Sequence, residues 1–165
     1  MTLKQTDSND QDFIKLVECL DKELALRDGD DHAFYHQYNG ISMIKYALVA
    51  YIVKSPVGCG AIKKFDDSTM EVKRMFVLQD YRGKGVARNI LTGLEQWSKK
   101  LGFKKCILET GINQHEALSL YQKSGFVRIP NYGQYVNVQN SFCFEKILKP
   151  KIEKFYHQNV KFLKT

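Results

Sequence analysis

The stretch "FVLQDYRGKGVARNIL", from Phe76 to Leu91, contains the point at which a strand pattern changes to a helix pattern. An apolar run ends at Leu78, Gly83 and Gly85 follow among basic residues, and apolar residues then return at helical spacing. Glycine lets a ligand approach the backbone closely, and the first N–H groups of a helix have no partners within the helix. The stretch therefore predicts a cradle for the phosphates of an anionic ligand. A solvated basic turn is the alternative that these residues alone leave open.

Two other phosphate-binding patterns fit this stretch poorly. A P-loop has Ser or Thr directly after Gly-Lys, whereas Gly85 follows Lys84 here. The dinucleotide-binding fingerprint needs a third glycine, which "GKGVAR" lacks.

The patterns on both sides of the cradle predict the rest of the fold. Upstream, a strand at 2–7 precedes a helix whose first turn has the capping-box spacing of Ser8 and Gln11. Three strands then follow in a row within 45–78, as in an antiparallel meander, with the first turn placed around Ser55-Pro56.

Downstream, strands and helices alternate. A helix at 86–101 leads to a strand at 104–110, a helix capped by Asn113 and closed by Gly125, and two last strands at 126–129 and 141–148. Such alternation implies some parallel pairing. We therefore expect an α/β (α+β) fold with a mixed, mostly antiparallel central sheet flanked by helices.

Composition limits the class of protein. The chain has 165 residues, of which 44% are hydrophobic and 26% charged, which is typical of one globular domain. No apolar run reaches membrane-spanning length, and "MTLKQTDSND" has no signal-peptide pattern. The four cysteines are far apart and no third ligand accompanies His32 and His36, so we expect a reduced, cytoplasmic protein without a metal site.

Two motifs together resemble the GNAT superfamily of acetyl-CoA-dependent N-acetyltransferases. Arg82, Gly85 and Ala87 match the spacing of the family's phosphate-binding motif. In the following helix, "NQHEALSLYQKSGF" matches a second family pattern at Asn113, Ala117, Tyr121, Gly125 and Phe126. The resemblance implies a GNAT acetyltransferase domain at 1–148, whereas 149–165 lies outside the family pattern and is predicted to be a basic helical extension.

The resemblance also implies how acetyl-CoA binds as cosubstrate, without a metal. The strands before and after the cradle splay apart, and pantetheine pairs with the first of them. A backbone N–H near Val77 or Leu78 then serves as the oxyanion hole. The residues expected to bind the cofactor are Phe76, Val77, Leu78, Arg82, Gly83, Lys84, Gly85, Val86, Ala87, Asn113 and Tyr121.

Catalysis requires a base and an acid. A lysine-like amine has a pKa of about 10.4, so a carboxylate must take its proton, directly or through water. Glu71, eleven residues before Arg82, is the expected base, and Glu109 is the second candidate. Tyr121 matches the family tyrosine that protonates the departing thiolate. The structural alternatives are an exposed Glu71 paired with Lys73 and a Tyr121 that belongs only to the core.

The acceptor is expected to be a primary amine, and a small molecule is favoured. The resemblance assigns its pocket to the segments 23–38 and 129–141. Acidic residues there can attract a cationic amine and aromatic residues can form walls: Glu23, Asp28, Asp30 and Asp31, with Phe34, Tyr35, Tyr132 and Tyr135. A homodimer is left open, and no membrane partner is expected.

Two rival functions are a non-catalytic acyl-CoA-binding module and a nucleic-acid-binding basic domain. The net charge of +7 prompts the second. Its lysines are scattered and no nucleic-acid motif accompanies them, so the enzyme is preferred.

Overall fold

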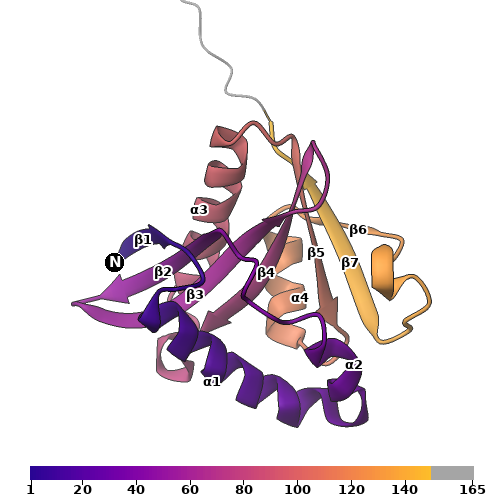
Figure 1. The fold of residues 1–165 in the computed structure, drawn as a ribbon, viewed down its shortest axis with the longest axis horizontal. Helices are drawn as coiled ribbons and strands as arrows, with labels where there is room; N and C mark the ends of the chain where they lie inside the picture. The colour runs from indigo at the N-terminus through magenta and orange to yellow at the C-terminus, as the bar shows by residue number, and fades with distance from the viewer. Residues whose placement is uncertain (150–165) are drawn as a thin grey trace, which may run out of the picture.

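A seven-stranded sheet organises residues 1–149, which are the part of the chain that the computed structural model describes (Figure 1). Its strand order is β1-β2-β3-β4-β5-β7-β6. The strands are β1 (Thr2–Thr6), β2 (Tyr46–Ile52), β3 (Ser55–Lys64), β4 (Thr69–Val77), β5 (Lys105–Gly111), β6 (Val127–Ile129) and β7 (Ser141–Ile147). Neighbouring strands are antiparallel except β4 and β5, which confirms the predicted fold class.

The parallel pair in the centre of the sheet is short. Only the first residues of β4 and β5 pair, from Thr69 opposite Lys105 to Glu71 opposite Ile107. Beyond Glu71 the edge of β4 that faces β5 has no strand partner, although β5 continues to pair with β7 up to Gly111. The predicted splay of the two central strands is therefore present, and it leaves backbone groups of β4 free for a ligand.

Helices cover both faces of the sheet (Figure 1). The helices α1 (Gln11–Asp28) and α2 (His32–His36) lie on one face, and α3 (Val86–Lys100) and α4 (His115–Lys123) lie on the other. The apolar stripe of α1 packs in one core cluster with Ala47, Val49 and Phe76 of the sheet. The stripe of α3 packs in a second cluster with Tyr121 of α4 and Leu108 of β5.

Two predicted helix caps are wrong. Asp10, not Ser8, caps α1, because its Oδ1 accepts hydrogen bonds from the N–H groups of Asp12 and Phe13, each at 2.9 Å. The N-cap of α4 is Gln114, which makes no side-chain cap bond. Asn113, the predicted cap, instead donates from Nδ2 to the backbone oxygen of Arg27 at 3.3 Å.

The predicted turn around Ser55-Pro56 is also misplaced. The β2–β3 hairpin turns at Val53 and Lys54, both with positive φ (47° and 67°), and Ser55 already pairs with Ile52. A two-residue hairpin loop needs positive φ at both positions to match the twist of its strands. Proline cannot donate to a strand ladder, and Pro56 lies where the register of the pair shifts.

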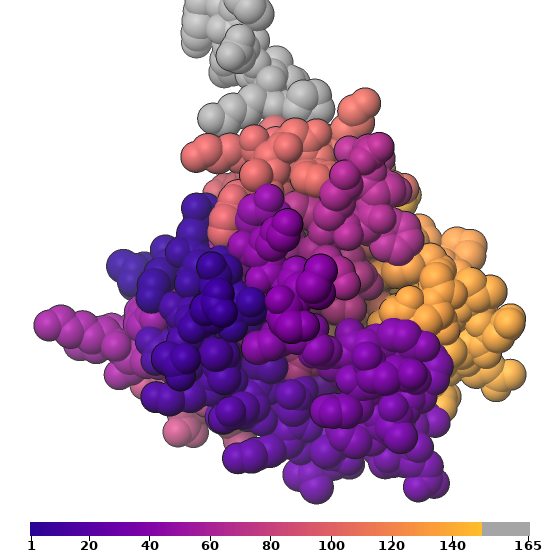
Figure 2. Space-filling model, viewed as in Figure 1, coloured from indigo at the N-terminus to yellow at the C-terminus, as the bar shows by residue number. Residues whose placement is uncertain are grey.

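The α2 region lies against the segment that precedes β7, as Figure 2 shows for this face of the molecule. Tyr35 and Tyr135 belong to one small core cluster with Cys143, and the Tyr35 hydroxyl is 2.8 Å from Oγ of Ser141. Within residues 1–149, no helix is long and apolar enough to cross a bilayer. The predicted C-terminal helix falls on residues 150–165, outside the described part of the chain.

Candidate active site

The predicted cradle forms the N-terminus of α3. Gly85 is the N-cap with φ +80°, and Gly83 has φ +72°. Glycine adopts these angles at little cost. No side chain caps the helix, so the N–H groups of its first turn have no side-chain partner. A Cβ on Gly83 would have no heavy atom within 4 Å, and one on Gly85 would meet only Asn89 at 3.9 Å. The cradle is therefore open to a ligand.

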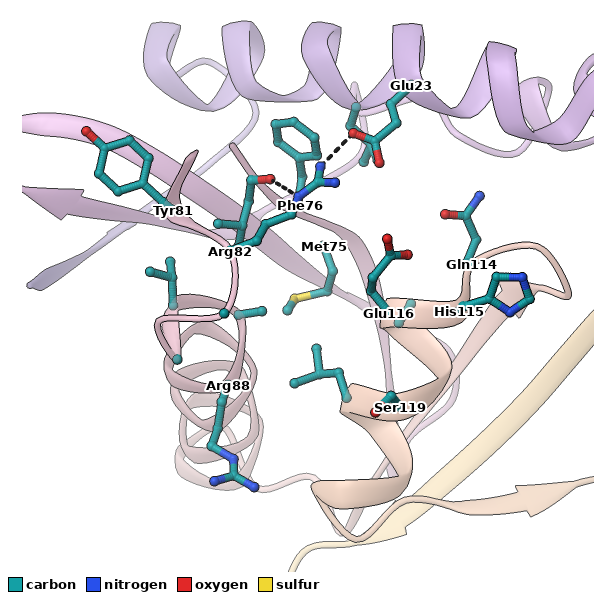
Figure 3. Close-up of a pocket in the computed structure, with 18 of the residues that line it drawn as sticks. Glu23, Met75, Phe76, Tyr81, Arg82, Arg88, Gln114, His115, Glu116 and Ser119 are labelled. Atoms are coloured by element: carbon teal, nitrogen blue, oxygen red, sulfur yellow. Dashed lines mark hydrogen bonds and ion pairs between the residues drawn. The ribbon is translucent and has the colours of Figure 1, made fainter. Parts of the chain in front are cut away.

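A cleft of about 790 Å³ lies over this cradle, between α1, β4, α3 and α4 (Figure 3). Most of the residues predicted to bind the cofactor line it: Phe76, Val77, Arg82, Gly83, Gly85, Val86 and Ala87. The cleft thus joins the phosphate cradle to the unpaired edge of β4.

Four residues predicted to bind the cofactor do not line the cleft. The N–H of Leu78 donates to the backbone oxygen of Val57 at 2.9 Å, so it is not free to serve as an oxyanion-hole donor. Lys84 donates from Nζ to the backbone oxygen of Asp80 at 2.9 Å. Asn113 is exposed next to α4, and Tyr121 lies deeper, in a second cavity.

A network of charged side chains crosses the cleft and was not predicted from the sequence. Arg82 donates from Nε to the oxygen of Val77 at 2.9 Å and from a terminal nitrogen to Glu23 at 2.6 Å (Figure 3). Arg27 pairs with Glu23 at 3.0 Å and with Glu116 at 2.7 Å. Its guanidinium lowers the pKa of Glu116 to about 2. Only the spacing of Glu23 and Arg27 on one helix was visible in the sequence.

A smaller cavity of about 120 Å³ adjoins the cleft, and both are lined by Leu20, Met75, Gln114 and Ala117. It lies where β4 and β5 separate, since its walls include Lys73 of β4 and Glu109 of β5. Of the residues that were expected around the acceptor, Asp28 and Tyr35 line this smaller cavity. Glu23 lines the larger cleft instead.

Glu109 and Tyr121, two of the titratable residues that line this cavity, are the ones that the sequence proposed as base and acid. Oε1 of Glu109 is buried without a hydrogen-bond partner. Burial raises the pKa of the Glu109 carboxyl to about 7, although Ser141 and Lys73 act in the opposite direction. Burial also raises the pKa of the Tyr121 hydroxyl, and the charge of Glu109 adds to that effect. Near neutral pH, Glu109 can therefore gain or lose a proton and Tyr121 keeps its own.

Glu71, the expected base, is buried but lies outside the walls of both cavities. Its Oε1 accepts a hydrogen bond of 2.9 Å from the hydroxyl of Tyr132, and its other oxygen is 3.7 Å from Nζ of Lys73. These contacts fit a residue that fixes Lys73 and the loop of Tyr132. Among residues 1–149, no cluster of three or more His, Cys, Asp or Glu side chains has the arrangement of a metal site.

Comparison with known proteins identifies the class. The model of the acetyltransferase (GNAT) family matches residues 13–126, and the chain belongs to this family. The IAA acetyltransferase of Azospirillum brasilense is 37% identical over 102 residues, which cover 61% of this chain and 67% of the relative. The uncharacterized N-acetyltransferase YsnE of Bacillus subtilis is 32% identical over 93 residues, which cover 55% of this chain and 62%, less than two thirds, of that protein.

Solved structures agree on the fold. A structure named as an acyl-CoA N-acyltransferase from Klebsiella pneumoniae has a TM-score of 0.75 and 28% identity, and the match covers 90% of this chain and 97% of that one. A GNAT family acetyltransferase from Elizabethkingia anophelis, solved with acetyl-CoA bound, has a TM-score of 0.62 at 19% identity. That match covers 89% of this chain and 97% of the other. The predicted family, the class of acyltransferase and acetyl-CoA as cosubstrate are confirmed.

The cradle provides a test of cofactor placement. Gly85→Glu is expected to lower the affinity for CoA by about tenfold or more, because a carboxylate then occupies the space for the phosphates and repels them. Isothermal titration with CoA measures this. Gly102→Glu is the matched control: Gly102 also has positive φ (92°) and open space, but it follows the other end of α3, roughly 22 Å away. Unchanged CoA affinity in a folded Gly85→Glu variant would refute the placement.

Proposed function

We propose that the protein transfers the acetyl group of acetyl-CoA to a primary amine by direct attack. The observation that carries this proposal is Glu109: it lines a cavity that adjoins the cleft over the phosphate cradle, and burial raises the pKa of its carboxyl to about 7. A base in that position is within the space where an amine and a thioester can meet. A module that only binds acyl-CoA has no need of such a carboxylate.

In this proposal, the N-terminus of α3 binds the pyrophosphate of acetyl-CoA. The guanidinium of Arg82, which is paired with Glu23 in this structure, reorients toward the negative charge of the bound pyrophosphate. Pantetheine follows the unpaired edge of β4, where backbone groups beyond Glu71 have no strand partner, although the oxygen of Val77 accepts from Arg82. The thioester then lies near Met75, Gln114 and Ala117, the side chains shared by the cleft and the smaller cavity.

The amine nitrogen attacks the thioester carbon, and Glu109 takes the proton that the nitrogen loses, directly or through water. The carbon–sulfur bond breaks, and the hydroxyl of Tyr121 donates its proton to the departing thiolate. Between the two candidate bases, the geometry favours Glu109, since Glu71 is bonded to Tyr132 and lies outside the cavity walls. Glu71 then acts as a positioning residue.

A panel of primary amines incubated with acetyl-CoA tests the proposed function, with release of free CoA thiol as the measurement. Thiol release that depends on both the amine and the enzyme is the expected result. If CoA binds but no amine in a chemically broad panel gives turnover, the protein is a binding module and the proposal is wrong.

A further inference from the structure

The cleft over the cradle has more positive than negative side chains in its lining. Its arginine and lysine side chains are Arg27, Arg82, Arg88 and Lys123. Arg27 and Arg82 are paired with the two carboxylates of the lining, Glu23 and Glu116. Within residues 1–149, Arg88 and Lys123 make no ion pair, so these two side chains carry the excess charge of the cleft.

The two unpaired cations lie on facing helices, away from the smaller cavity. Arg88 of α3 is three residues beyond Gly85, and in Figure 3 its guanidinium points away from Arg82 and Glu23. Lys123 is in the last turn of α4, roughly 12 Å along the helix from its first residue. The smaller cavity adjoins the other end of α4, and no residue of α3 lines it.

The chemistry of CoA supplies an anion for this part of the cleft. On one side of its pyrophosphate CoA has pantetheine, which in the proposed function follows β4 toward the smaller cavity. On the other side it has an adenosine with a 3′-phosphate, which must therefore leave the cradle away from that cavity. A phosphate monoester has a charge of about −1.5 to −2 at neutral pH and accepts charge-assisted hydrogen bonds from arginine and lysine. Its charge matches the two unpaired cations.

We propose that Arg88 and Lys123 bind the 3′-phosphate of CoA and make the protein select CoA over 3′-dephospho-CoA. This inference rests on the proposed placement of the pyrophosphate at the cradle and adds a second phosphate site to the same cleft. Neither residue lines the smaller cavity, so both act on cofactor affinity and not on the chemical step. Replacing either one is expected to raise KM for acetyl-CoA and leave kcat unchanged.

The test is isothermal titration with CoA and with 3′-dephospho-CoA, two ligands that differ only in this phosphate. At pH 8 the phosphate monoester has about two negative charges. We expect the wild type to bind CoA about tenfold more tightly, because each exposed ion pair contributes up to about fivefold. The double variant Arg88→Gln/Lys123→Gln is expected to bind both ligands equally, with about the affinity that the wild type has for 3′-dephospho-CoA.

Lys100→Gln/Lys104→Gln is the matched control, because it removes the same charge at the other end of α3. Both lysines are exposed and line neither cavity, so this variant is expected to keep the tenfold ratio. Arg88 and Lys123 are also exposed, and melting curves establish that each variant is folded.

Two results would overturn the inference: equal affinity of the wild type for the two ligands, or a ratio that the Arg88→Gln/Lys123→Gln variant retains. In either case the cradle still accounts for pyrophosphate binding if Gly85→Glu weakens the binding of both ligands. A wild type that binds neither ligand would contradict the proposed function as well.

Discussion

Replacing Glu109 with glutamine is expected to lower kcat/KM for acetyl transfer by roughly 10²- to 10⁴-fold, the usual contribution of a general base. Glutamine has nearly the same shape and still forms hydrogen bonds, but it cannot accept the proton of the attacking amine. CoA affinity, measured by isothermal titration, is expected to be unchanged, because Glu109 does not line the cofactor cleft. A loss of rate without a loss of CoA binding separates catalysis from folding.

The pH profile of the wild type gives a second readout of the same residue. Glu109 must be ionised to accept a proton, and burial raises its pKa to about 7. The rate constant kcat/KM is therefore expected to rise with pH through about 7, where the carboxyl loses its proton. The charges that act on it come from Lys73, Glu71 and Asp28.

Glu71→Gln is the matched control, since it makes the same substitution in a neighbouring carboxylate outside the cavity. It is expected to keep the inflection near pH 7, whereas Glu109→Gln loses it. If Glu71→Gln abolished the inflection and Glu109→Gln retained both rate and inflection, the base would be Glu71.

The Tyr121→Phe variant is expected to lower turnover by about 10²-fold or more. The substitution removes only the hydroxyl that we assign as proton donor to the CoA thiolate. Because that interaction belongs mainly to the transition state, the affinity for acetyl-CoA is expected to change little. The ring of Tyr121 still packs against Phe126 and Phe144, whose centroids are 5.9 and 6.3 Å away, so the core is preserved.

Tyr46→Phe is the control for a tyrosine that belongs to the core alone. Tyr46 packs against the same core cluster and stacks edge-on with Trp97, at 5.3 Å between ring centroids, but it lines neither cavity. It is expected to keep the wild-type rate. Steady-state kinetics and a melting curve on both variants distinguish a catalytic Tyr121 from a structural one. A near-wild-type rate and a lower melting temperature for Tyr121→Phe would remove Tyr121 from the mechanism.

The cradle and the sheet were predictable because local sequence determines them. Gly83 and Gly85 adopt positive φ between a strand and a helix, and the apolar pattern around them has the periods of those elements. The alternation of strands and helices predicted some parallel pairing, and β4 and β5, on either side of the cradle and α3, form such a pair. Helix caps and turns were less predictable, since Asp10 and Ser8 are both good cap residues and only the geometry selects one.

The arrangement of the site could not be predicted because it depends on contacts between distant segments. Glu23 was expected near the acceptor, but α1 brings it to Arg82, 59 positions away in the chain. Leu78 was expected to offer a free N–H, but the β3–β4 pairing uses it. Glu71 was the expected base and Glu109 the second candidate. The structure favours Glu109 only through its place in the wall of the smaller cavity, whereas Glu71 lies outside that wall and accepts a hydrogen bond from Tyr132.

In direct transfer, acetyl passes from acetyl-CoA to the amine without first being attached to the protein. The most direct test is to quantify, in one reaction, free CoA, N-acetylated amine and acetylated protein by mass spectrometry, with an amine that gives turnover. We expect equal amounts of free CoA and N-acetylated amine, with no acetyl group on the protein at any time. Accumulation of acetylated protein before the product forms, or release of CoA with free acetate and no acetylated amine, would contradict it.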